Sequence, residues 1–289
     1  DDRARTKVVF SGDLGQPARP VVRDPVAIED ADVLLVESTY GNRNHKSMAE
    51  TVDELLDAVS ETLSRGGNLI VPAFALGRTQ DLLVLLGEQT LAGRLSELKV
   101  FVDSPLAAAA TQATLRHANV LDAGTRDILR RALAGNLPMH LRFTESVDDS
   151  KALNRIRGGA IIIAASGMCD AGRVRHHLER NLPRSECGVL FTGFQAQGTL
   201  GRRLVDGARS AKLFGEEVPV RAKRFTLGGL SAHADRDALL GWLRRFRRAP
   251  KRTWTVHGEA ETAVGFARAI EDELGWRASA AIRGDTLEL

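Results

Sequence analysis

Short runs of apolar and β-branched residues recur along the chain, each ending at glycine, serine or proline. We predict strands in the runs TKVVF (residues 6–10), DVLLVES (32–38), NLIVPAF (68–74), LKVFVDS (98–104), AIIIAAS (160–166) and GVLFTG (188–193). The apolar residues in these runs are consecutive and do not alternate with polar ones, which is typical of strands that are covered on both faces. The pattern therefore favours a parallel sheet.

Two segments between these strands have apolar residues at helical spacing. The segment MAETVDELLDAVSETLSRGG (48–67) ends in a pair of glycines, which stop a helix readily, and RTQDLLVLLGEQ (78–89) has the same period. We find no repeat of fixed period and no low-complexity tract in the sequence. Strands that alternate with helices predict an α/β fold.

The composition is that of a globular protein. With 289 residues, 43% of them hydrophobic, the chain can bury a full core, and its length favours one large or two ordinary domains. The longest nearly uncharged apolar run, GGAIIIAASGMC (158–169), is far shorter than the roughly 20 residues that span a bilayer, and no signal-peptide pattern opens the chain. We therefore expect a soluble, cytoplasmic protein without a membrane partner.

Cysteine content and charge narrow the choice of chemistry only slightly. Cys169 and Cys187 lie far apart without a C-x-x-C companion, which indicates reduced, partly buried thiols. The formal net charge of +3 permits an anionic partner without requiring one. Residues 244–252, RRFRRAPKR, form a basic run, and such a run is more often a solvated helix end and loop than a phosphate-binding patch. Both interpretations of this run stay open.

Polar and charged residues gather where the predicted strands end. In open α/β sheets, ligands bind at the carboxyl ends of strands, where loops and helix N-termini offer free backbone N–H groups. The residues at such positions are Asp13, Glu37, Arg78, Ser104, Ser166, His233 and His257.

Asp13, Glu37 and His233 each have a chemical and a structural interpretation. Asp13 lies in FSGDLG between two glycines that let a cation approach closely, although a turn-forming aspartate fits equally well. Glu37 ends an apolar strand, where a carboxylate is costly unless it is paired. His233, in LSAHAD, can be that partner, since a carboxylate favours the charged imidazole and so provides a general acid near neutral pH. Taken alone, His233 is more often a helix-start histidine bonded to backbone.

The remaining histidines and loops give weaker signals. His257, in VHGE, directly follows a strand in the usual geometry of a zinc-binding imidazole, but one histidine is not a site. His176 and His177 point about 100° apart on a helix and are expected to be structural or surface residues. The loops FALGRTQ and SGMCDAGRVRHHL bring Arg78 and Arg173 to helix starts, which are suited to anions. Neither loop is a Walker A or dinucleotide fingerprint, so we expect no nucleotide cofactor.

Seven motifs in order span nearly the whole chain: FSGDLG, VESTYG, PAFALGRTQ, SGMCDAGRVRHHL, GTLGRR, LSAHAD and VHGE. This set resembles the β-CASP branch of the metallo-β-lactamase superfamily, which includes bacterial and archaeal ribonucleases and the nuclease of pre-mRNA 3′-end processing. The resemblance implies an α/β fold, in which residues 1–40 and 221–289 form part of a metallo-β-lactamase αββα sandwich. Residues 41–220 would form an inserted α/β β-CASP domain.

The resemblance also implies roles for single residues. Asp13 matches the family aspartate that bridges two zinc ions, Glu37 the acid of the first β-CASP motif, and His233 the histidine of the second motif. His257 matches the histidine of the third motif, a ligand of the second zinc. Family members that act on DNA tend to carry valine at this position, so His257 favours RNA.

The expected enzyme is a zinc-dependent phosphodiesterase that cleaves RNA. In it, Asp13, Glu37 and His233 are catalytic, and Asp13 and His257 bind metal. Two zinc ions would clamp the scissile phosphate, and His233, oriented by Glu37, would protonate the leaving oxygen. The candidate phosphate contacts, placed only by their position at strand ends and loops, are Arg78, Ser104, Ser166 and Ser231.

One departure from the family pattern matters. The family's H-x-H-x-D-H motif and a further zinc histidine precede FSGDLG, whereas this chain contains no H-x-H. Truncation is the simplest account and natural loss is the alternative. We expect this chain alone to bind zinc weakly and to cleave little RNA. The rival functions are a non-catalytic RNA-binding or partner subunit and a small-molecule hydrolase; the expected partners are RNA and, as one option, a second copy in a homodimer.

Overall fold

The computed structural model describes residues 5–17, 24–117, 119 and 121–286, which form two compact units. The first unit contains the described residues up to His45 and those from Ser231 onward, and the second runs from Lys46 to Leu230. The chain passes between the two units after residues 45 and 230, whereas the predicted domain limits follow residues 40 and 220. The backbone N–H of His45 donates to Asp235 in the first unit, which keeps residues 41–45 there. Strand β10 pairs with β7 of the second unit, which keeps the segment after residue 220 there.

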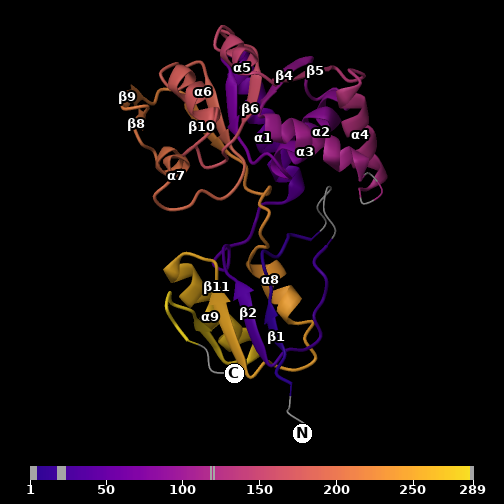
Figure 1. The fold of residues 1–289 in the computed structure, drawn as a ribbon, viewed down its shortest axis with the longest axis vertical. Helices are drawn as coiled ribbons and strands as arrows, with labels where there is room; N and C mark the ends of the chain where they lie inside the picture. Colours follow the sequence, from indigo (N-terminus) through magenta and orange to yellow (C-terminus); the bar gives the residue numbers. More distant parts are fainter. Residues whose placement is uncertain (1–4, 18–23, 118, 120, 287–289) are drawn as a thin grey trace. The chain divides into compact units, whose positions relative to one another are not determined.

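The first unit is built on a four-stranded, entirely parallel sheet in the order β1-β2-β11-β12 (Figure 1). Its elements are β1 (Val8–Phe10), β2 (Val33–Glu37), α8 (Arg236–Leu243), β11 (Arg252–Val256), α9 (Ala260–Leu274) and β12 (Ala278–Ala280). Leu34 and Val36 of β2 share a buried cluster with Leu239 of α8 and Phe266 of α9. The two helices therefore cover one face of this sheet.

The other face of the same sheet is also apolar. Phe10, Leu35 and Trp254 form one row across three strands, because Leu35 is the register partner of both other residues. Phe10 is 72% exposed, and none of the three belongs to a buried cluster of the described residues. Leu35 and Trp254 are partly buried, so this face carries a contiguous apolar row in which Phe10 is the exposed member.

The second unit is built on a six-stranded parallel sheet in the order β10-β7-β3-β6-β4-β5. Its strands are β3 (Leu69–Pro72), β4 (Leu98–Asp103), β5 (Met139–Phe143), β6 (Ile161–Ala164), β7 (Gly188–Phe191) and β10 (Lys223–Thr226). Its helices are α1 (Met48–Ser64), α2 (Arg78–Leu91), α3 (Pro105–Arg116), α4 (Ala123–Leu133), α5 (Val147–Leu153), α6 (Val174–Asn181) and α7 (Leu200–Val205).

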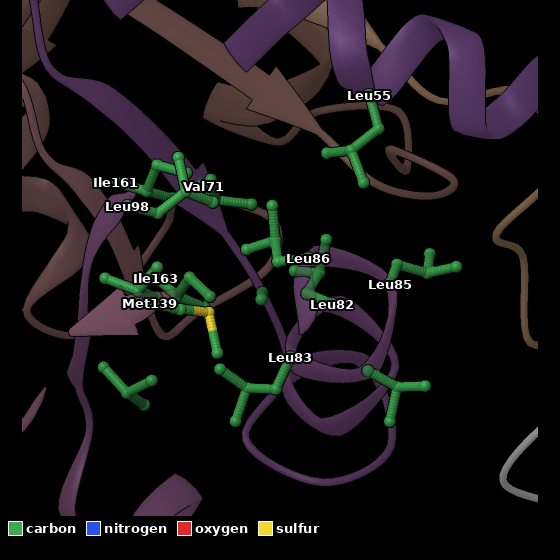
Figure 2. Close-up of a cluster of buried hydrophobic side chains, with 14 of the residues drawn as sticks. Leu55, Val71, Leu82, Leu83, Leu85, Leu86, Leu98, Met139, Ile161 and Ile163 are labelled. Atoms are coloured by element: carbon green, nitrogen blue, oxygen red, sulfur yellow. The ribbon is translucent and has the colours of Figure 1, made fainter. Parts of the chain in front are cut away.

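Both faces of this sheet are buried, as the consecutive apolar runs predicted. On one face, Val71, Ile161 and Ile163 lie against leucines of α2, with Leu55 of α1 in the same cluster (Figure 2). On the other face, Ile70 and Ile162 lie in a cluster with residues of α6 and α7. The six predicted strand runs and the two predicted helices are all present. They end within a few residues of the predicted limits.

An antiparallel hairpin of β8 (Ser210–Leu213) and β9 (Glu216–Pro219) was not predicted from the sequence. β8 alternates between exposed and buried residues, and β9 buries only Val218, so neither strand contains the consecutive apolar run that marks the central strands. Leu213 and Val218 belong to the buried cluster on the α6 side of the large sheet. The hairpin is therefore anchored to the second unit by its apolar face.

Candidate active site

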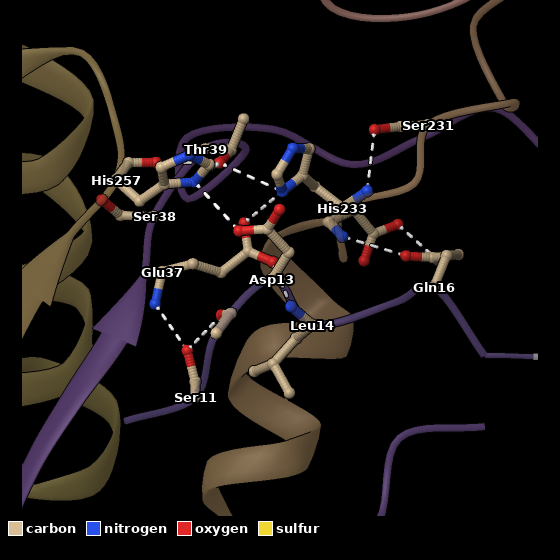
Figure 3. Close-up of polar contacts among 12 residues, drawn as sticks. Ser11, Asp13, Leu14, Gln16, Glu37, Ser38, Thr39, Ser231, His233 and His257 are labelled. Carbon is tan, nitrogen blue, oxygen red and sulfur yellow. Dashed lines mark hydrogen bonds and ion pairs between the residues drawn. The ribbon is translucent and has the colours of Figure 1, made fainter. Parts of the chain in front are cut away.

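Three of the predicted site residues meet because their strands are neighbours. Asp13 follows β1, Glu37 is the last residue of β2, and His257 directly follows β11. Since these strands are adjacent and parallel, their carboxyl ends lie at one edge of the sheet. His233, in the loop before α8, reaches the same place, so four residues from distant parts of the sequence converge (Figure 3).

Glu37 is the buried carboxylate of this site, with 1% of its surface exposed. Its Oε1 accepts the backbone N–H of Leu14, and its Oε2 lies 2.8 Å from Nδ1 of His233. Its own backbone N–H donates to Oγ of Ser11 at 3.0 Å. The predicted pairing of Glu37 with His233 is thus present, and it satisfies a charge that would otherwise be costly to bury.

His233 is held at both its ring and its backbone. Burial works against the charged ring, but the hydrogen bond to Glu37 and the charges of Glu37 and Asp13 outweigh it and raise the pKa of His233. The backbone N–H of His233 donates to Oγ of Ser231 at 3.1 Å, and its carbonyl oxygen lies 3.0 Å from Nε2 of His45. Glu37 occupies Nδ1, so Nε2 is the ring nitrogen left for chemistry.

The donor atoms of Asp13, His233 and His257 lie within 4.8 Å of one another, close enough to share a metal ion. Oδ1 of Asp13 is 3.4 Å from Nδ1 of His257, and the two imidazole rings are 5.3 Å apart. The side chains of Asp13 and His257 are 63% and 58% exposed, so solvent reaches this part of the site. Carboxylate oxygen and imidazole nitrogen are donors that suit zinc.

Thr39 is a site residue that the sequence analysis missed. Its hydroxyl donates to the carbonyl oxygen of His257 at 2.8 Å and lies 3.3 to 3.4 Å from Nδ1 of both His257 and His233. His257 has a φ of 53°, in the left-handed region that non-glycine residues adopt at a cost. Thr39 therefore stabilises the strained backbone of His257, a candidate metal ligand. Its place in VESTYG, two residues after Glu37, was the available signal.

Gln16 is a second residue that was not predicted, and it contacts the turn that carries His233. In that turn, Asp235 caps α8 by accepting the backbone N–H of Ala238 at 2.8 Å. Its backbone N–H donates to Oε1 of Gln16, and the Gln16 amide donates back to Asp235 at 3.2 Å. Gln16 thereby joins the loop of Asp13 to the turn of His233.

Ser231 lies in this site, where its hydroxyl makes a local structural contact, and the phosphate contact stays a prediction. It is 6% exposed, and its hydroxyl accepts the backbone N–H of His233. Because this bond is made two residues away within one turn, Ser231 fixes the shape of the turn. Its contribution to the site is the position of His233.

The other three predicted phosphate contacts lie in the second unit. Arg78, Ser104 and Ser166 follow β3, β4 and β6, which are neighbours in the sheet, so the strand-end placement is correct. Ser104 is 6% exposed and caps α3 by accepting the backbone N–H of Ala107, which is a structural use of its hydroxyl. Arg78 pairs with Asp81 at 3.8 Å, and Ser166 accepts the backbone N–H of Ala171.

A buried network at this edge of the second unit was also missed. The carboxylate of Asp103 is fully buried and accepts hydrogen bonds from Thr144, Ser150 and Arg173, with Nε2 of His177 2.6 Å away. His177 is buried, which agrees with the prediction of a structural role. No single sequence motif predicts the network, because its members come from β4, α6 and the segments around β5 and α5.

The basic run and the two cysteines were also interpreted from the sequence. The arginines and lysine in the basic run 244–252 are largely neutralised, since Arg244, Arg247, Arg248 and Lys251 pair with acidic side chains, namely Glu273, Glu29, Asp30 and Asp32. The run is therefore the helix end and loop that was the commoner interpretation. Cys169 and Cys187 are free and buried. In the described part of the chain, no helix has the length and apolar character to cross a bilayer.

Comparison with known proteins decides the family. The family model of the Beta-Casp domain matches residues 79–204, and that of the Zn-dependent metallo-hydrolase RNA specificity domain matches residues 217–281. The chain belongs to the β-CASP family of the metallo-β-lactamase superfamily. The Beta-Casp match falls within the second unit, so the α/β fold with an inserted β-CASP domain is the architecture of this chain.

Curated β-CASP relatives carry names connected with RNA. A ribonuclease of Thermus thermophilus is 36% identical over 266 residues, which are 91% of this chain and 60% of the relative. An RNase J-like protein of Methanocaldococcus jannaschii is 28% identical over 98% of this chain and 65% of the relative. A transcription termination factor FttA of Thermococcus kodakarensis is 31% identical over 84% of this chain and 39% of the relative. The chain thus spans less than two thirds of the length of these relatives.

Proposed function

We propose that this chain supplies catalytic residues to a zinc-dependent phosphodiesterase that cleaves RNA. The convergence of Asp13, Glu37, His233 and His257 at one sheet edge carries the proposal. The ribonuclease name of the Thermus thermophilus relative and the description of the RNA specificity domain support RNA as the substrate class.

The donor set fits the metal that the family description names. Asp13 and His257 would hold the ion, and both have their donor atoms at the solvent-exposed side of the site. A bound zinc ion neutralises charge on a phosphate and activates water as a nucleophile. The chain's own task is to keep Asp13 and His257 in position, which Thr39 does for the backbone of His257.

His233 is proposed as the proton donor to the leaving oxygen. Glu37 fixes Nδ1 and stabilises the charged ring, which leaves the proton on Nε2 available for transfer. The hydroxyl of Ser231 and the ring of His45 fix the backbone on either side of the residue, so the imidazole is aimed before substrate arrives. Arg78 and Ser166 stay candidate phosphate contacts.

A non-catalytic RNA-binding or partner subunit is the second candidate function. It is favoured by the count of donors, because among the described residues only Asp13, His233 and His257 form a potential metal group. Catalytic zinc sites use three protein ligands for each ion, so this group does not complete a site for two ions. The buried Glu37 favours catalysis, since a binding module has no need of a buried charge aimed at a histidine. A homodimer and a cytoplasmic location stay predictions.

The experiment compares end-labelled RNA with p-nitrophenyl esters under single-turnover conditions, with zinc and after chelation. We expect slow cleavage of RNA that stops on chelation and returns with zinc, and no hydrolysis of the esters. The His257→Ala variant should lose this activity, while His140→Ala, which changes an exposed histidine paired with Glu97, should retain it. RNA binding without zinc-dependent cleavage would favour the second candidate, and ester hydrolysis alone would contradict both.

A further inference from the structure

Positive charge is concentrated in one segment of the second unit. Residues 201–224 contain seven lysines and arginines and three acidic residues, a net charge of +4, whereas the whole chain carries +3. The rest of the chain is therefore slightly acidic. The segment includes α7, the hairpin β8–β9 and most of β10, which lie together at one side of the second unit (Figure 1).

Five exposed cations of this segment make up what we call the hairpin surface: Arg203, Arg209, Lys212, Arg221 and Arg224. Within the described residues, none of the five has a carboxylate oxygen within 4.0 Å of its charged nitrogens. Lys212 comes nearest to a partner, since it lies opposite Glu217 in the register of the hairpin. The other two acids of the segment are Asp206, which pairs with Arg202, and Glu216.

Hydrogen bonds bring these cations close together. The backbone N–H of Ala208 donates to the carbonyl oxygen of Arg203 at 3.0 Å, and the guanidinium of Arg224 donates to the carbonyl oxygen of Ala208 at 2.9 Å. The next residue, Arg209, accepts the backbone N–H of Val220, which directly precedes Arg221. Four arginines therefore surround the two chain segments that enter and leave the hairpin.

The hairpin is a rigid support for these side chains. Its apolar face is anchored in the core through Leu213 and Val218. At its tip, the ring of Phe214 stacks on His176 of α6 with ring centres 4.4 Å apart, and the guanidinium of Arg175 lies 4.7 Å from the same ring. A surface held in this way loses little conformational freedom when a partner binds.

The basic run at residues 244–252 offers an internal comparison. It contains more consecutive cations than the hairpin surface, but most of them are paired with acidic side chains. A polyanion would have to displace those carboxylates to bind there. At the hairpin surface it would displace only small counterions, and release of such ions drives the binding of nucleic acids.

We propose that the hairpin surface binds the phosphate backbone of RNA, as a site in addition to the residues at the sheet edge of the first unit. Four of its five cations are arginines, whose planar guanidinium groups donate two parallel hydrogen bonds to a phosphate. The inference rests on the proposed function for its choice of RNA as the anion. To the proposed function it adds the part of the chain that would hold the RNA away from the phosphate that reacts.

The test measures binding of a fluorescein-labelled oligouridine of about 20 nucleotides by fluorescence anisotropy over a series of salt concentrations. The test variant combines Arg203→Gln, Arg209→Gln and Arg221→Gln, and leaves Arg224 in place because its guanidinium bonds to backbone. The control variant combines Arg244→Gln, Arg247→Gln and Arg248→Gln. Both variants lose three charges, so a general effect of net charge is the same in both. Thermal melting confirms that each variant folds.

We expect the test variant to bind about tenfold more weakly than the wild type at moderate salt, because three phosphate contacts are lost. Its slope of log Kd against log salt should fall by about 2, since each contact to a single strand contributes about 0.7. The control variant should keep the wild-type slope. Equal losses in both variants, or an unchanged Kd in the test variant, would overturn the inference while leaving the proposed function standing. A wild-type chain that binds no oligouridine would overturn both.

Discussion

Asp103 offers the sharpest prediction about stability, because one fully buried carboxylate joins several elements of the second unit. Thr144 and Arg173 donate hydrogen bonds to one oxygen of this carboxylate. Ser150 donates to the other oxygen, which also lies 2.6 Å from Nε2 of His177. The substitution Asp103→Asn keeps the size of the side chain and removes its charge. It also places an amide N–H₂ group where one carboxylate oxygen accepted hydrogen bonds.

The expected cost follows from this geometry. Removing one partner of a buried ion pair costs about 3 to 5 kcal/mol, because the other charge stays buried without compensation. Arg173 is partly exposed and can turn toward water, so the lower half of that range, about 3 kcal/mol, is the expected value. For a unit of this size, each kcal/mol lowers the melting temperature by about 2 to 4 °C, which gives a decrease of about 6 to 12 °C.

The assay is thermal unfolding followed by circular dichroism, with Asp148→Asn as the matched control. The Asp148 side chain is 94% exposed, and its pair with Lys151 is 3.9 Å long, so its loss should leave the melting temperature unchanged within about 2 °C. A melting temperature of Asp103→Asn equal to that of the control would refute the reasoning. It would show that the network contributes no net stability.

The same network makes the stability of the second unit depend on pH. Burial opposes the charge on Asp103, but hydrogen bonds from His177, Thr144 and Ser150 outweigh it and hold the pKa of this carboxyl well below its usual value of about 4. The unfolded chain therefore takes up a proton first as pH falls. The contribution of Asp103 is fully present above about pH 4 and is lost as pH falls further toward the folded pKa. Below pH 4 the wild type should lose stability, and Asp103→Asn should lose less of it.

Three further predictions concern a ligand position, an exposed surface and a helix cap. Thr39→Val should weaken zinc binding about 10-fold in a competition with a chelator dye, because residues that orient ligands have effects of this size; an unchanged affinity would contradict the role of its hydroxyl. Phe10→Ser should reduce binding of a hydrophobic dye and change the free energy of unfolding by less than about 0.5 kcal/mol, because Phe10 is exposed. A larger change, or unchanged dye binding, would contradict the exposure of the apolar row. Ser47→Ala should destabilise α1 by about 1 kcal/mol in urea unfolding through loss of the capping box, whereas Ser64→Ala should have no such effect.

Periodicity predicted most of the fold, because the elements of the second unit are long and their apolar runs are consecutive. The runs at residues 68–74 and 160–166 became adjacent central strands with both faces buried. The hairpin β8–β9 was not predicted because its strands contain no consecutive run of apolar residues. The units divide at other residues than the predicted domain limits, because the hydrogen bond from His45 to Asp235 depends on tertiary contact and leaves no local pattern.

The residues of the candidate site that lie at the ends of strands could be predicted from the sequence. Asp13, Glu37 and His257 were found because polar residues at the ends of neighbouring parallel strands must meet, and His233 because Glu37 requires a partner. Ser104 and Ser231 were assigned to substrate by the same argument. The structure shows their hydroxyls accepting nearby backbone N–H groups, and their phosphate contacts stay predictions. A sequence position shows that a hydroxyl reaches the site. It does not show to which neighbouring group that hydroxyl forms its hydrogen bond.

The division of labour between His257 and His233 is the central claim. The most direct measurement is the zinc content of the His257→Ala and His233→Ala variants at a fixed free zinc concentration, determined by competition with a chelator dye, beside their rates of RNA cleavage. The account predicts that His257→Ala loses both zinc and cleavage. His233→Ala should keep the zinc content of the wild type and lose about 100-fold or more in rate, as expected for removal of a general acid. Loss of zinc from His233→Ala equal to that from His257→Ala, or full activity of His233→Ala, would contradict the claim.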